Sequence, residues 1–226
     1  MSEYSYRLIR ENRKTVSLRV DEDGELTVKA PFYAAKGFID DFVDANAAKL
    51  LADYMAGQAD RERKREFLSK PPEKLPYHGK ELPVILSEDA FYLRFGNDRF
   101  YCPMRPLSEL IPSLEQLYKK LARSMIPELL DVAEMMGRSP SDIRINSARG
   151  RWGSCSSKGS INLSWRLVLA DERTRRYVMI HELSHLTYLD HSRDFWDLVG
   201  KHEPDYKLFR ERLNTVSRTL EKYGLD

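Results

Sequence analysis

Cysteine, long apolar runs and charge of one sign are all scarce in this sequence of 226 residues. The two cysteines, Cys102 and Cys155, are too few for a disulfide-stabilised scaffold. No segment approaches the roughly 20 apolar residues of a membrane-spanning helix, and the first residues lack the apolar stretch of a secretory signal. With 37 basic and 35 acidic side chains, the net charge of +2 does not make the whole chain a nucleic-acid binder. We therefore expect a globular, cytoplasmic protein with no membrane partner.

The first half of the chain predicts short strands around one long helix. Apolar residues alternate on both sides of the turn residues 21–24, which predicts a β-hairpin. The apolar spacing then becomes helical from Ala34 to Leu68, before Pro71 and Pro72 end the helix. Further strands are expected at 82–86, 91–95 and 99–102, with a turn at 96–98.

The second half predicts mostly helix, with one small sheet. A helical stretch covers residues 112–136, and Pro127 is expected to split it. A strand follows at 143–145, and a turn rich in Gly and Ser leads into another strand at 161–168. From Asp171 onward the spacing is helical again.

The strongest motif is the segment His181-Glu182-Leu183-Ser184-His185. Two histidines four positions apart project from one face of a helix, about 6 Å apart along its axis. Both imidazoles can then reach one zinc ion, with bonds of about 2.0 to 2.1 Å. Glu182, beside the first histidine, is placed to take a proton from a water at the metal. The alternative is a helix surface that happens to carry two histidines.

A catalytic zinc also needs a third protein ligand and an open fourth position. His191 is the nearest candidate, but a continuous helix would rotate it by roughly 120° from the metal face, so the helix must end before it. Asp190 and Ser192 are suitable caps for a new helix at Arg193, which supports such a break. Tyr188 occupies the position of the glycine in the metzincin motif, which argues against a true metzincin. The competing third ligands are Glu203, His202 and Cys155.

Four blocks of the sequence resemble one known family. They are RWGSCS at 151–156, INLSWRL at 161–167, HELSH at 181–185 and HSRDFW at 191–196. Together they resemble the YgjP-like metallopeptidases, which are relatives of the SprT-like zinc proteases. The resemblance covers most of the chain and implies a zinc peptidase in which His181, His185 and His191 bind the metal and Glu182 is the catalytic acid and base.

The expected fold class is α+β. Residues 1–104 are expected to form an N-terminal region of β-hairpins with a long helix. Residues 105–226 are expected to form the zinc metallopeptidase domain, a zincin-like part with a small antiparallel sheet and the HExxH helix.

The block from Arg151 to Cys155 offers candidate substrate-binding residues. In zinc peptidases a strand beside the HExxH helix typically receives the substrate backbone by strand addition. Gly153 would permit close approach of that backbone, and Arg151 could orient a carboxylate or stabilise an oxyanion. The alternative is that Trp152 and Trp165 pack in the core while Arg151 caps a carbonyl. Cys155 is expected to be a small buried hydrophobe.

Three functions remain open from the sequence. We favour a zinc-dependent peptidase that hydrolyses peptide or protein substrates, with Glu182 as general base and then general acid. The zinc could instead be structural, or belong to a binding module without proteolytic activity. The third possibility is a nucleic-acid-associated protease of the SprT kind. It is supported by the charged run 61–65 and by the arginines at 149, 151, 166, 173, 175 and 176.

Overall fold

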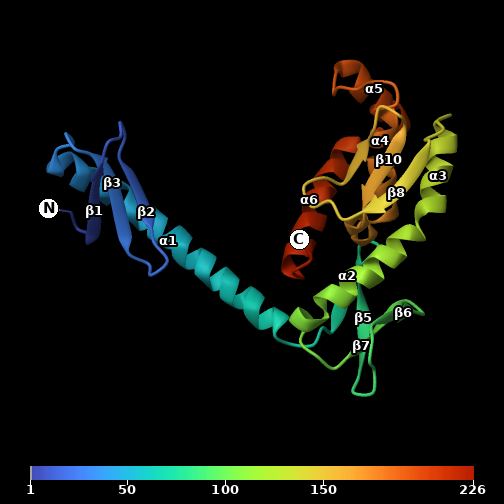
Figure 1. Cartoon of the computed structure of the whole chain (residues 1–226), viewed down its shortest axis with the longest axis horizontal. Helices are drawn as coiled ribbons and strands as arrows, with labels where there is room; N and C mark the ends of the chain where they lie inside the picture. The colour runs from blue at the N-terminus through green and yellow to red at the C-terminus, as the bar shows by residue number, and fades with distance from the viewer. Residues whose placement is uncertain (1) are drawn as a thin grey trace. The chain divides into compact units, whose positions relative to one another are not determined.

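The computed structural model describes residues 2–226, which form two compact units (Figure 1). The first unit ends at Glu66 and the second is Phe67–Asp226. This division differs from the boundary predicted near residue 104, because Leu75, Phe100 and Cys102 are buried in the same core as the helices that follow them. No helix within residues 2–226 combines the length and the apolar character needed to cross a membrane.

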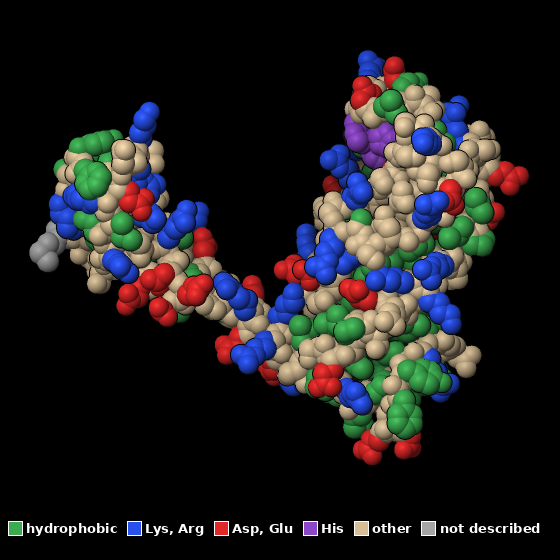
Figure 2. Space-filling view, viewed as in Figure 1, with side chains coloured by type: hydrophobic (Ala, Val, Ile, Leu, Met, Phe, Trp, Pro, Cys, Tyr) green, Lys and Arg blue, Asp and Glu red, His purple; other side chains and the backbone are tan. Residues whose placement is uncertain are grey.

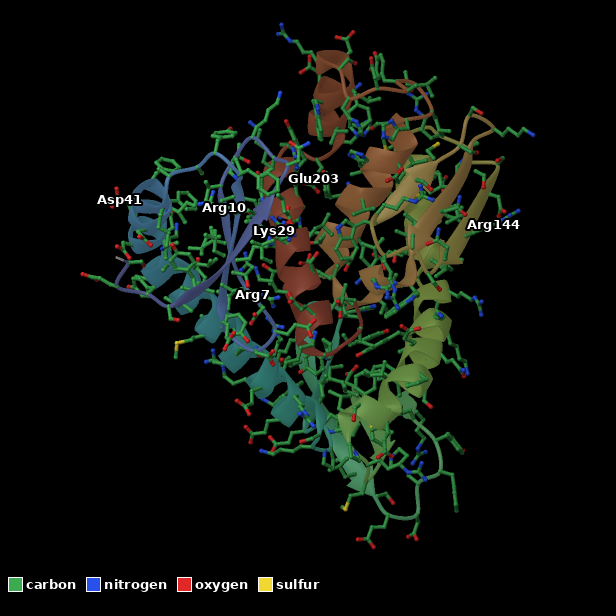
Figure 3. The ribbon with its side chains drawn as sticks, turned by 60° about the vertical axis from the view of Figure 1, so that its left-hand side comes forward. Arg7, Arg10, Lys29, Asp41, Arg144 and Glu203 are labelled. Carbon is green, nitrogen blue, oxygen red and sulfur yellow. The ribbon has the colours of Figure 1, made fainter. Side chains whose placement is uncertain are left out.

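The first unit is a three-stranded sheet packed against one helix. The predicted hairpin is confirmed, since β2 and β3 pair antiparallel on either side of a turn in which Gly24 has a φ of +87°. An additional strand, β1, lies parallel to β3, and Arg10 and Lys29 lie on this sheet (Figure 3). The core of the unit joins Val28 of the sheet to Ile39 of the helix. The elements are β1 Tyr6–Glu11, β2 Ser17–Val20, β3 Leu26–Pro31 and α1 Lys36–Leu68.

The second unit begins with a four-stranded sheet of order β4-β5-β7-β6. The predicted turn at 96–98 is confirmed, because it joins β6 to β7 as an antiparallel hairpin. Two helices follow, and they separate just before Pro127, as the sequence predicts. The elements are β4 Lys74–Tyr77, β5 Lys80–Ser87, β6 Arg94–Gly96, β7 Arg99–Pro103, α2 Leu107–Arg123 and α3 Ile126–Met135.

The small sheet that follows is mixed, so the prediction of an antiparallel sheet is wrong. Its strands are β8 Asp142–Asn146, β9 Gly153–Cys155 and β10 Ser160–Ser164, in the order β8-β10-β9. The turn after β9 makes β9 and β10 an antiparallel hairpin. Strand β8 pairs with the other edge of β10 and runs parallel to it. As a result, β9 is an edge strand of this sheet.

The strand predicted over 161–168 ends early, at Ser164. A 3₁₀ helix, η1, covers Trp165–Leu169 and is buried along its whole length. Trp165 stacks on Tyr118 of α2 with ring centroids 5.9 Å apart. Because this packing buries side chains on every side of the segment, an alternating strand pattern does not persist there.

Three helices complete the unit: α4 Glu172–Ser184, α5 Arg193–His202 and α6 Tyr206–Lys222. Asp171 caps α4, since its side chain accepts a hydrogen bond of 2.9 Å from the Thr174 backbone N–H. Helix α4 contacts α6, α5 and β9, and Figure 1 shows it beside the small sheet. The HELSH segment therefore lies at the end of a helix that the surrounding elements hold on several sides.

Candidate metal centre

Three histidine side chains meet where α4 ends and α5 begins. One ligand nitrogen from each of His181, His185 and His191 lies within 4.8 Å of the other two. The Nε2 atoms of His181 and His191 are 3.1 Å apart. Two ligands of a tetrahedral zinc with bonds of 2.0 to 2.1 Å lie about 3.3 Å apart, so the spacing suits a shared metal ion. Figure 2 shows histidine side chains as one patch at the surface of the second unit.

A break in the helix brings His191 close to the other two histidines, as the sequence analysis requires. Helix α4 ends at Ser184, and the Tyr188 backbone N–H donates to the Ser184 carbonyl over 3.0 Å, which closes a turn. The next helix begins at Arg193, directly after the predicted cap Ser192. The Ser192 side chain makes no capping hydrogen bond, whereas its backbone N–H donates to Asp190 over 3.3 Å.

The turn also orients the second histidine. Nδ1 of His185 lies 2.9 Å from the Tyr188 carbonyl oxygen. A carbonyl can only accept, so this contact places the proton on Nδ1 and leaves the Nε2 lone pair available for a metal ion. Tyr188, which stands where metzincins have glycine, thus contributes through its backbone rather than its side chain.

A buried phenylalanine supports all three imidazole rings. The Phe195 ring centroid lies 4.9 Å from that of His181, 4.6 Å from that of His185 and 4.8 Å from that of His191. Phe195 is fully buried, and the neighbouring Trp196 ring lies 5.7 Å from both His181 and His191. The sequence analysis assigned these aromatics no role, although they lie in the family block 191–196.

The surroundings favour the neutral form of two of the histidines, which is the form that binds metals. Burial, together with the nearby His185, His191 and Arg210, lowers the pKa of His181 to about 3. Burial also lowers the pKa of His191, with His185 acting in the same direction. Neutral imidazole carries a free nitrogen lone pair, so the cluster is ready for a cation near neutral pH.

The carboxyl of Glu182 is buried beside the cluster. Glu182 is 6% exposed, and burial raises its pKa to about 7, while the Arg151 charge opposes that rise. A carboxyl with a pKa near 7 can both accept and release a proton at neutral pH. This is the property needed of a group that acts first as a base and then as an acid.

The absence of a side chain at Gly153 makes room for this carboxyl. A Cβ atom built on Gly153 would lie 2.5 Å from Oε1 of Glu182, 2.7 Å from its Cγ and 2.8 Å from its Cδ. Three atoms of one side chain would thus clash, not only its flexible end. The sequence analysis expected Gly153 to admit a substrate backbone, whereas the structure places Glu182 against it.

We expect Gly153→Ala to reduce peptide hydrolysis by about a hundredfold, because a displacement of about 1 Å at a catalytic group costs roughly that factor. Initial rates on an unfolded protein substrate would measure this loss. Gly96→Ala is the matched control, since a Cβ there has nothing within 4 Å. Equal activity of the two variants would show that the contact with Glu182 does not matter.

A cavity opens directly in front of the carboxyl. Its volume is about 340 Å³, and both His181 and Glu182 line it. The predicted substrate-binding residues Arg151, Trp152 and Gly153 line it as well. The sequence analysis missed the α6 residues in its wall, although their spacing of three and four positions places them on one helix face. The cavity is completed by Tyr177, Val178, Arg210, Leu213 and Asn214.

The competing third ligands lie outside the cluster. Glu203 is 4% exposed and accepts a hydrogen bond of 3.1 Å from Arg173. Burial lowers the pKa of His202, and the charges of Lys201, Arg138 and Arg176 act in the same direction. Burial raises the pKa of Cys155, and Glu182 adds to that rise, so this thiol stays protonated. Trp165 packs in the core, as one of the two alternatives predicts.

Comparison with known proteins identifies the family. A model of the YgjP-like metallopeptidase domain matches residues 14–216, which is most of the chain. The chain belongs to the YgjP-like metallopeptidase family. This YgjP-like chain is therefore a metal-dependent peptidase with peptide or protein substrates, and the comparisons give no support to a nucleic-acid partner.

Other comparisons add little to the YgjP-like assignment. No curated protein matches the chain. Among solved structures, the metallopeptidase zymogen of Pyrococcus abyssi abylysin is 30% identical over 40% of this chain and 93% of that chain, with a TM-score of 0.38. A structural overlap this loose supports no statement about the present fold.

Proposed function

We propose that the chain is a zinc-dependent peptidase in which His181, His185 and His191 hold the zinc ion and Glu182 moves the proton. The observation that carries this proposal is the meeting of three imidazoles beside a buried carboxyl at the wall of a cavity. Imidazole nitrogens suit zinc among the divalent metals, although cobalt, nickel and iron bind them too.

The ligand set favours a catalytic zinc over a structural one. Structural zinc sites are closed by four protein ligands, whereas catalytic sites have three and leave one position for water or substrate. Among residues 2–226, these three histidines are the only group of His, Cys, Asp or Glu side chains found close enough together to hold a metal ion. The proposed site thus has an open position, which supports a peptidase rather than a binding module without activity.

Zinc in such a site supplies an activated water and polarises the substrate carbonyl. Glu182 accepts the proton of the attacking water and then donates it to the leaving amine. Its pKa of about 7 suits both steps. Arg151, which lines the same cavity, is placed to orient the substrate or to stabilise developing negative charge.

We propose that the substrate backbone binds along the edge strand β9. Within residues 2–226 this strand pairs only with β10, so its other edge is not used by the sheet. Its first residue, Gly153, contacts Glu182. A peptide added along β9 would therefore carry its scissile bond past the carboxyl.

The ion pairs of two arginines weaken the case for a nucleic-acid-associated protease. Arg173 pairs with Glu203 and Asp205 at 3.1 and 3.5 Å. Arg175 is buried and pairs with Glu128 at 2.9 Å. These two guanidinium groups are paired with carboxylates of the protein, so they are less available to phosphates than the sequence suggests.

Chelation should test the proposed cofactor. We expect the purified protein to contain one zinc per chain and to lose its cleavage of an unfolded protein substrate when a chelator is added. Added zinc should restore cleavage. Chelation should also lower the melting temperature, because an ion bound only by the folded state stabilises it. Full activity in metal-free protein would reject the proposal.

A further inference from the structure

A second cavity adjoins the catalytic one. Its volume is about 500 Å³, and it shares Arg151 and Trp152 with the cavity in front of Glu182. Three arginines line it, whereas only one acidic side chain, Asp226, does so. The cavity therefore has an excess of positive charge. The three arginines are Arg149, Arg151 and Arg166.

Arg166 is a buried cation whose side chain donates hydrogen bonds to backbone carbonyls. It is 3% exposed, and its Nε donates to the Leu225 carbonyl over 3.0 Å. Its Nη1 donates to the carbonyls of Ser147 and Ala148 over 3.3 and 3.4 Å. These acceptors are backbone dipoles, and the charges of Glu115 and Asp226 also attract the guanidinium. Burial nevertheless lowers the pKa of Arg166, so a further anion in the cavity would stabilise its charge.

The other two arginines are exposed, and Arg151 also acts on the nearby carboxyl of Glu182. Elsewhere in the same unit, Arg173, Arg175 and Arg144 each pair with a carboxylate. The cavity thus gathers three guanidinium groups around one acidic side chain, Asp226. Burial is the largest cause of the lowered pKa of Arg166, and Arg149 adds to it, whereas Glu115 and Asp226 oppose it. Two cations this close favour a shared anion.

We propose that this cavity binds a carboxylate of the peptide substrate, either an acidic side chain or a free C-terminal carboxylate. Guanidinium groups bind carboxylates through two parallel hydrogen bonds, and Trp152 supplies an apolar wall. The proposal rests on the proposed function, since the shared Arg151 and Trp152 connect this cavity to the scissile bond. A nucleic-acid backbone fits less well, because Arg166 is almost fully buried and only a small group could reach its guanidinium.

Peptide binding to the Glu182→Gln protein tests the carboxylate pocket, because this variant is expected not to hydrolyse the probe during the measurement. The probes are four N-acetylated tetrapeptides with Asp or Asn at the second position, each ending in a free carboxylate or an amide. We expect a carboxylate probe to bind about tenfold or more tightly than its neutral match, as for a hydrogen-bonded charge. In Arg149→Gln this ratio should fall toward one.

Arg144→Gln is the matched control, because Arg144 lies on β8 at the outer side of the small sheet and pairs with Asp142 (Figure 3). It should retain the ratio. Preference for Asp over Asn would identify a side-chain carboxylate, and preference for the free terminus would identify the terminal one. Either preference, lost only in Arg149→Gln, supports the proposal.

Three results would overturn it: equal binding of charged and neutral probes, an equal loss in both arginine variants, or an effect of Arg149→Gln on single-stranded DNA binding alone. The pocket proposal and the peptidase proposal can be rejected independently of each other. A carboxylate preference without any peptide hydrolysis would reject the peptidase mechanism and retain the pocket, whereas hydrolysis without the preference would reject only the pocket.

Discussion

Glu182→Gln should lower peptide hydrolysis by about a hundredfold to ten-thousandfold, the usual range for loss of a general acid and base. The amide has nearly the shape of the carboxyl, but it cannot accept and release the proton. It contributes no ligand to the histidine cluster, so the zinc content should stay at the wild-type value. The measurement is initial rate and metal content of the same preparation.

The matched control is Glu203→Gln, which makes the same change at another buried glutamate, 4% exposed and paired with Arg173. Its effect should be on stability rather than on the chemical step. Wild-type hydrolysis by zinc-loaded Glu182→Gln would reject the assigned role.

Stability offers a second readout for Glu182→Gln. Burial raises the folded-state pKa of Glu182 from 4.5 to about 7, so the folded protein holds this proton more tightly than the unfolded chain. Stability from this group is therefore complete at low pH and is lost as pH rises through about 7. At about pH 8, metal-free Glu182→Gln should thus melt no lower than metal-free wild type.

His185→Ala should remove both metal and activity. Loss of an outer hydrogen-bond partner costs 10- to 100-fold in metal affinity, and loss of a direct ligand should exceed that. The substitution also removes the contact of the His185 ring with Phe195. Competition with a chromogenic chelator would measure the zinc affinity, and hydrolysis would be assayed in parallel.

His202→Ala is the appropriate control for this variant, because His202 lies on α5 outside the cluster. It should bind zinc as wild type does. Stoichiometric, tightly bound zinc in His185→Ala would show that the three histidines are not the metal site.

The parts of the site that were predictable are those set by local sequence. The spacing of His181 and His185, and the break between the helix that ends at Ser184 and the helix that begins at Arg193, are properties of neighbouring residues. The structure brings His191 to the other two histidines through that break. Its function as a ligand stays a prediction.

The parts that were not predictable depend on contacts between distant segments. The parallel pairing of β8 with β10 leaves no local signal, because each strand alone would also suit a hairpin. The contact of Gly153 with Glu182 joins a strand to a helix. Similarly, Trp165 looks like a strand residue until its packing on Tyr118 is known.

The support of three imidazoles by Phe195 has a consequence for the order of assembly. His181 and His191 are ten positions apart, and Phe195 follows shortly after, so the whole cluster is one short stretch of chain. Contacts between near neighbours form early in folding, whereas the meeting of Gly153 with Glu182 requires β9 to dock. If the proposed roles hold, we expect the histidine cluster to be able to bind metal before the Glu182 carboxyl is positioned, and peptide hydrolysis to require the complete fold.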